Sequence, residues 1–223
     1  MKKILSIALA TMMMTANASA QSQYYNTKHE VGISVGAGAF TEIVSSLADA
    51  TSIAVSATLT TLVTLGTNTA YYTYGNEKAI PTISAEYYWH VNKVVGWGGL
   101  VAFNGSSRDM YVNWHDNVND THRMEKSGEA TRRNLSLIPM AKIDWLRCRY
   151  FGLYSKAGLG VSFMFEHQED DVEGGTDFTD TTVIPNFQTT LLGIEAGSQR
   201  MRAYIEVGIG EQGMALAGLK YKF

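Results

Sequence analysis

Apolar and polar residues alternate one by one along this chain, in eight runs of about ten residues that are separated by turn residues. Side chains of a β-strand point alternately to its two faces, so this period predicts half-buried strands. Runs of this length could cross hydrocarbon as tilted strands. The runs cover residues 31–39, 83–91, 95–103, 134–145, 151–166, 183–197, 201–210 and 215–223. In the weak sixth run the apolar face changes after Leu191, which predicts a bulge near Gly193 that turns Glu195 inward.

The connections between the runs fall into two length classes. Residues 92–93, 147–149 and 198–199 predict short turns, whereas residues 41–79, 105–131 and 167–181 predict long loops, and only the last hairpin, near Glu211 and Gln212, is tight. Short turns on one side and long loops on the other are typical of outer-membrane barrels. We therefore expect an all-β chain folded as an eight-stranded antiparallel up-and-down transmembrane β-barrel, with both termini in the periplasm.

A soluble eight-stranded barrel, such as a lipocalin, would show the same alternation with its faces reversed. Two features favour the membrane. The polar face is rich in glycine, which suits a narrow lumen but would weaken a strand exposed to water. Aromatic residues gather at strand ends that should share one level, as in a periplasmic aromatic girdle. The predicted girdle consists of Trp89, Trp97, Trp145, Phe151, Tyr221 and Phe223.

The N-terminus has the pattern of a secretory signal peptide. Lys2 and Lys3 precede a short apolar core, and Ala18-Ser19-Ala20 offers a cleavage site. We expect residues 1–20 to be removed and residues 21–223 to form the barrel domain; the alternative is a retained anchor. The net charge of −3 does not suggest a nucleic-acid partner, and Cys148, the single cysteine, excludes an intrachain disulfide. We expect no cofactor.

Residues 43–65 are apolar but contain many serines and threonines. Their polar residues follow a helical period, which predicts an amphipathic helix in the first external loop. A strand over residues 53–65 is the alternative, because apolar residues also alternate there, but an added strand would upset the even count.

Charges on the polar face of the runs are nearly balanced. Four of them should lie at similar depth, and we expect a structural network of pairs that plugs the lumen, because unpaired charges would be costly there. A narrow pore is the alternative. The candidate network consists of Glu86, Lys142, Lys156, Glu206, Arg202 and Asp144.

Two predicted loops carry groups that could perform chemistry. The loop over residues 166–180 is acidic and is either solvated or a site for a hard cation, whose candidate ligands are Asp170, Asp171, Glu173 and Asp177. In the second loop, His115 and Asp116 with His122 nearby could form an acid–base site. That would suit a lipid A-modifying enzyme at the outer leaflet, but we predict no catalytic residue.

The ending Leu219-Lys220-Tyr221-Lys222-Phe223 resembles the C-terminal signal of outer-membrane barrels, and the whole of residues 21–223 resembles the small OmpA/OmpX-type barrels. Residues 206–213 with that ending look most like uncharacterised barrel proteins of Bacteroidetes. Pro139 and Pro185 depart from the pattern, because proline removes a ladder donor. The resemblance implies a porin-like integral protein of a Gram-negative cell envelope with a structural or surface-interaction role. It also implies three partners: outer-membrane lipid, lipopolysaccharide, and the barrel assembly machinery acting through Phe223.

Overall fold

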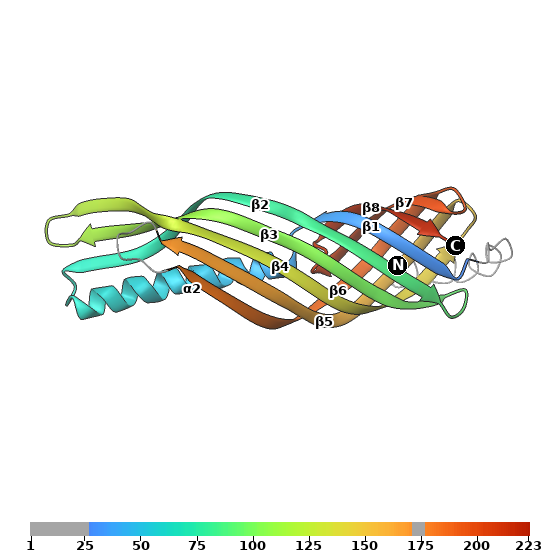
Figure 1. Cartoon of the computed structure of the whole chain (residues 1–223), viewed down its shortest axis with the longest axis horizontal. Helices are drawn as coiled ribbons and strands as arrows, with labels where there is room; N and C mark the ends of the chain where they lie inside the picture. The colour runs from blue at the N-terminus through green and yellow to red at the C-terminus, as the bar shows by residue number, and fades with distance from the viewer. Residues whose placement is uncertain (1–26, 171–176) are drawn as a thin grey trace, which may run out of the picture.

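A computed structural model describes residues 27–170 and 177–223 and shows a closed barrel (Figure 1). Each strand pairs antiparallel with its neighbour in the chain, and the first strand also pairs with the last. The predicted eight-stranded up-and-down barrel with one helix after the first strand is therefore confirmed. The elements are β1 (His29–Ala37), α2 (Phe40–Val63), β2 (Asn68–His90), β3 (Val95–Asp116), β4 (Thr121–Arg147), β5 (Phe151–Asp170), β6 (Phe178–Gly197), β7 (Met201–Gly210) and β8 (Ala215–Lys222).

The two faces of the barrel wall have opposite polarity. Along β7, exposed and buried residues alternate, and the exposed ones are Met201, Ala203, Ile205, Val207 and Ile209. The buried ones between them include charged Arg202 and Glu206. A soluble barrel would bury the apolar set, so this arrangement is that of a transmembrane barrel, in which lipid contacts the outer face. Closure also leaves no unpaired strand edge in the bilayer.

Lumen glycines make room for tyrosine rings on the neighbouring strands. Gly193 of β6 lies opposite Tyr154 of β5, and Gly218 of β8 lies opposite Tyr204 of β7. A Cβ atom on Gly193 would lie 2.4 Å from Cζ of Tyr154, and one on Gly218 would lie 2.6 Å from Cζ of Tyr204. The glycine-rich polar face thus lets large rings fill a narrow lumen.

The strands are much longer than the sequence predicts. The long loop predicted over residues 105–131 is mostly wrong, and the one predicted over residues 41–79, which contains the predicted helix, is wrong from Asn68 on. β2 already begins at Asn68, β3 continues to Asp116 and β4 begins at Thr121, so these strands form a paired sheet beyond the barrel wall (Figure 1). We call residues 68–80, 105–116 and 121–133 the strand extension. Water contacts much of this sheet, so its strands need no apolar face and show no period-two signal.

The third predicted long loop, over residues 167–181, is also shorter than expected. β5 continues to Asp170 and β6 begins at Phe178, with Gln168 of β5 opposite Phe178. The predicted bulge in β6 is confirmed, because the pairing with β7 shifts between Thr190 and Leu192. That shift puts Glu195 in the lumen, where it is buried.

Helix α2 is confirmed, and the alternative strand over residues 53–65 is wrong. The helix accommodates its many serines and threonines because their hydroxyls donate hydrogen bonds to backbone carbonyls one turn earlier, as Thr51 does to Leu47 and Thr58 to Ala54. The helix ends where Leu65 and Gly66 adopt positive φ angles. Among the described helices α2 is the one long and apolar enough to cross a membrane by length and composition. It instead runs from the barrel along the strand extension (Figure 1).

Candidate functional site

The six predicted girdle residues are exposed, and they lie at or near the strand ends on the side of the barrel where β1 begins and β8 ends. Trp89 lies directly opposite Trp97 across β2 and β3. Phe223 donates its backbone N–H to His29 and accepts that residue's N–H in return, at 2.8 and 2.9 Å. Trp145 donates its indole N–H to the Ser155 hydroxyl at 2.8 Å. The position of these rings suits a membrane–water interface.

The centre of the lumen holds a lysine between two carboxylates. Lys156 Nζ lies 2.5 Å from Glu86 and 2.9 Å from Glu206, and all three side chains are at most 3% exposed. Glu206 also accepts hydrogen bonds from the Tyr154 hydroxyl at 2.6 Å and the Thr190 hydroxyl at 2.7 Å. The structure therefore brings together three of the four residues expected at similar depth.

The fourth, Lys142, lies directly opposite Lys156 across β4 and β5, but its side chain belongs to a second group. Its ammonium contacts Glu30 and lies 3.5 Å from Asp144. His90 lies between the same two carboxylates, 3.4 Å from each. Lys142 also faces the Tyr154 ring, with its ammonium 4.2 Å from the ring centre.

A third group surrounds Glu195. Arg202 donates to Glu195 at 2.7 Å and to the backbone carbonyls of Cys148 and Arg149 at 2.7 and 2.9 Å. Lys222 contacts the same carboxylate, and Lys220 lies 3.4 Å from it. The sequence indicated Glu195 only through the predicted bulge.

Buried charge in the barrel wall is balanced among the described residues. Six cations, Lys142, Arg147, Lys156, Arg202, Lys220 and Lys222, are buried there, and so are six carboxylates, Glu30, Glu86, Asp144, Glu195, Glu206 and Glu211. Glu211 differs from the other five because its partners are hydroxyl and amide groups. Tyr88, Leu100, Ile138 and Met140 form an apolar cluster beside them. Charges of opposite sign at contact distance, together with filling rings, leave the lumen packed and polar.

Glu211, in the turn between β7 and β8, joins helix α2 to the barrel. Its carboxylate accepts from the Thr41 hydroxyl at 3.0 Å, the Asn104 amide at 2.8 Å, the Ser136 hydroxyl at 2.9 Å and the Asn186 amide at 2.8 Å. The Thr41 backbone N–H, in the first turn of α2, donates to the same group at 3.3 Å. A carboxylate at a helix N-terminus is favourable, so this contact holds the start of α2 at the barrel mouth.

Asp49 fixes the helix further along the strand extension. Its carboxylate contacts Arg108 of β3 and accepts two hydrogen bonds from Arg132 of β4, at 2.8 and 2.9 Å. Arg132 also pairs with Glu166 of β5 at 3.1 Å. Burial alone would raise the pKa of Asp49, but the hydrogen bonds from Arg132 and Arg108 outweigh it and hold that pKa below its usual value of 3.8.

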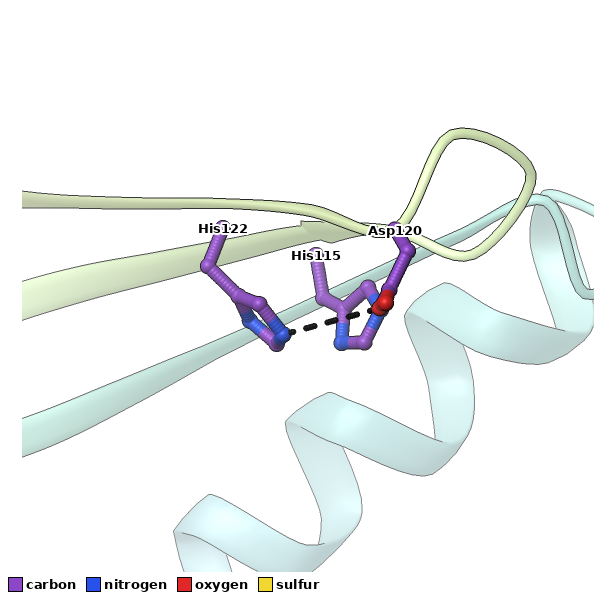
Figure 2. A group of neighbouring side chains, drawn as sticks. All are labelled: His115, Asp120 and His122. Atoms are coloured by element: carbon purple, nitrogen blue, oxygen red, sulfur yellow. Dashed lines mark ion pairs between the residues drawn. The ribbon is translucent and has the colours of Figure 1, made fainter.

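At the tip of the extension, His115 and His122 lie opposite each other on β3 and β4. Asp120, and not the predicted Asp116, lies beside them: its carboxylate is 3.4 Å from His115 Nε2 and 4.0 Å from His122 Nε2 (Figure 2). Asp116 instead accepts the backbone N–H groups of Val118 and Asn119 at 2.9 and 3.1 Å. Hydrogen bonds from Asn119 and Val118 lower the pKa of Asp116. We call His115, Asp120 and His122 the histidine cluster.

The structure says less about the acidic loop, Cys148 and the expected signal peptide. Of the four acidic residues considered for a hard cation, Asp171 and Glu173 lie outside the described residues, while Asp170 ends β5 and Asp177 precedes β6 and is exposed. Cys148 lies in the turn between β4 and β5 and is a free, partly exposed thiol. The expected signal peptide also lies outside the described residues.

No family model and no curated protein matches this chain. Among solved structures it is similar to Ail, the attachment invasion locus protein of Yersinia pestis, solved with the heparin analogue sucrose octasulfate, at 12% identity and a TM-score of 0.40, covering 88% of this chain and 99% of Ail. It is also similar to the N-terminal β-barrel domain of Pseudomonas aeruginosa OprF, at 12% identity and a TM-score of 0.36, covering 89% and 100%. The translocator domain of the autotransporter NalP from Neisseria meningitidis matches at 8% identity and a TM-score of 0.32, covering 98% and 97%. These likenesses do not bear on activity, and none supports a closer relation to Bacteroidetes barrels.

Proposed function

We propose that this chain is an integral outer-membrane β-barrel with a closed lumen, and that it presents its helix and strand extension outside the cell for surface interaction. The observation that carries the proposal is the reversed polarity of the barrel wall, apolar outside and charged but balanced inside. An apolar outer face needs lipid, and a lumen filled by tyrosine rings and ion pairs offers solutes no open path.

The strand extension supports the outward role. From Phe103, where the apolar outer face of β3 ends, to His115 there are twelve residues, or about 40 Å of strand and about 30 Å along the barrel axis at a tilt of about 40°. Helix α2 covers this sheet yet keeps Leu47, Val55, Leu59 and Leu62 exposed. Such an apolar face is typical of surfaces that contact another molecule.

Conductance across a planar bilayer tests the closed lumen. The purified barrel should give no stable channel steps, whereas a stable and sizeable conductance would favour the narrow pore.

The histidine cluster does not support a lipid A-modifying enzyme. The cluster lies about 30 Å beyond the end of the apolar outer face of β3, which is too far from the acyl chains of lipid A. Mass spectrometry of lipid A from cells with and without the protein should show no difference, and a new lipid A species would overturn this view.

Orientation can be tested with the chain's own cysteine. Cys148 lies at the end of the barrel where the proposal places the periplasm, so a membrane-impermeant maleimide should leave it unlabelled on intact cells. A Cys148→Ser chain that carries Asn119→Cys at the tip of the extension should be labelled. Labelling of the native chain, with no labelling of the second variant, would place the termini outside. The matched pair also reports on which side of the membrane the termini lie, because they share the Cys148 end of the barrel.

A further inference from the structure

The hairpin that joins β3 to β4 brings two imidazoles and a carboxylate to one point. His115 and His122 are direct cross-strand partners, so their side chains lie on the same face of the sheet. Their ring centres are 3.8 Å apart. Asp120 adopts a positive φ of 51°, an unusual conformation for a residue other than glycine. In that conformation its carboxylate points toward both Nε2 atoms (Figure 2).

The spacing of these three groups is that of a metal-ligand set. One ligand atom from each residue lies within 4.8 Å of the other two. Zinc bound tetrahedrally at about 2.0–2.1 Å from its ligands separates those ligands by about 3.3–3.4 Å. The separation of 3.4 Å between His115 Nε2 and the Asp120 carboxylate already matches, and that of 4.0 Å from His122 needs only a small side-chain rotation.

The turn that carries the histidine cluster is held by hydrogen bonds within the turn and by hydrogen bonds to the segment between α2 and β2. Asp116 accepts two backbone N–H groups within the turn. Asn117 donates its backbone N–H to Thr67 at 2.8 Å and its side-chain amide to the Gly66 carbonyl at 2.9 Å. Both acceptors lie between α2 and β2, so the tip is tied to the helix end. Ligands on a fixed scaffold lose less entropy on binding than ligands on a free loop.

We propose that His115, Asp120 and His122 bind one divalent transition-metal ion of the Zn²⁺ class at the outer tip of the strand extension. Neutral imidazole nitrogens and a carboxylate are ligands that zinc, copper and nickel accept, whereas calcium prefers sites made only of oxygen. Three protein ligands leave at least one coordination position for water or for a donor atom of a partner.

Calorimetric titration with Zn²⁺ alone tests the site. The chain should carry no histidine tag and be folded in detergent micelles, and its electrophoretic heat shift should be intact. We expect one Zn²⁺ per chain. His115→Ala and His122→Ala should each weaken Zn²⁺ binding at least about 100-fold, because losing a ligand should cost at least as much as losing a residue that only hydrogen-bonds to a ligand.

His167 provides a matched control. Its Nε2 lies 3.3 Å from Glu169, almost the separation of His115 and Asp120, but the structure gives it no second imidazole. His167→Ala should therefore leave Zn²⁺ affinity unchanged. Absence of binding to the native chain, or binding that survives the double change of His115 and His122 to alanine, would overturn the proposal.

Proton NMR of the native chain keeps the test decisive if a variant fails to fold. Zn²⁺ should shift the imidazole resonances of two of the five histidines and leave the other three, His29, His90 and His167, in place. Shifts confined to those three would contradict the assignment.

Discussion

Replacing Lys156 by methionine should destabilise the folded barrel by about 3 kcal/mol, the lower end of the cost of breaking a buried ion pair. The change removes the ammonium that lies 2.5 Å from Glu86 and 2.9 Å from Glu206. Methionine preserves much of the apolar stem, so the loss is electrostatic rather than one of packing. Two carboxylates then face each other without the cation between them.

The magnitude follows from burial and from the contacts that remain. These side chains are 0–3% exposed, so the range for surface pairs, about 0–1 kcal/mol, does not apply, and that for buried pairs, about 3–5 kcal/mol, does. Glu206 keeps its bonds from Tyr154 and Thr190, and Glu86 keeps Lys220 at 4.0 Å. Because these contacts remain, we expect a cost at the lower end of the range for buried pairs, about 3 kcal/mol.

Equilibrium unfolding by urea in lipid vesicles, followed by tryptophan fluorescence, measures the effect. Lys126→Met is the matched control, because Lys126 lies 2.8 Å from Asp109 but the two side chains are 46% and 21% exposed. Its cost should stay below about 1 kcal/mol. Adding Glu206→Gln to Lys156→Met should recover part of the loss, since it removes one of the two facing charges. Equal costs for the two lysine variants would refute the reasoning.

Three further outcomes are expected. Asp49→Asn should speed hydrogen exchange of the α2 amides at least about 10-fold, because Arg108 and Arg132 lose a charged partner worth about 1.5–3 kcal/mol per hydrogen bond. The pKa of Asp49 is lowered in the folded chain, so the stability that its carboxylate gives to docked α2 should be complete above pH 3.8 and be lost as pH falls through the lowered pKa. Hydrogen exchange of the α2 amides should therefore accelerate only in stronger acid. Gly193→Ala should cost about 1–3 kcal/mol, since its Cβ would lie 2.4 Å from the Tyr154 ring.

Each of these has its own check. Exchange in β7 and β8 should not respond to Asp49→Asn, and a barrel-wide response would mean that the barrel, not the helix, depends on Asp49. Acceleration of α2 exchange already near pH 6 would contradict the lowered pKa. Gly99→Ala is the control for Gly193→Ala, because its Cβ would meet only the Ile138 carbonyl oxygen, at 3.9 Å. A cost as large at Gly99 would show that backbone freedom, and not the Tyr154 ring, is responsible.

Strand number, closure and the first helix were predictable because each leaves a periodic signal. Alternation at residues 201–210 indicates a wall between lipid and lumen, and the polar period of residues 43–65 indicates a helix with one side on a sheet. The strand extension was missed for the same reason: beyond Phe103 both faces of β3 meet polar surroundings, so pairing continues without alternation.

Contacts between residues distant in sequence were harder to predict. Lys156 and Glu206 could be placed at one depth by counting from strand ends, but Lys142 turned to Glu30, on a strand across the lumen. Glu211 and Asp49 gain their roles from where α2 docks, which no local pattern indicates. Asp116 adjoins His115 in sequence, yet the turn directs Asp116 to its own backbone and brings Asp120 to the imidazoles.

Fluorescence quenching by brominated lipid measures the central claim, that lipid surrounds the apolar wall while the extension stays in water. The change Trp114→Phe leaves Trp89, Trp97 and Trp145, all on the girdle. We expect strong quenching of this chain by lipid brominated close to the headgroup, and little for a chain that keeps Trp114 as its single tryptophan. A chain that folds in buffer without detergent or lipid, and whose girdle tryptophans escape quenching, would contradict the account.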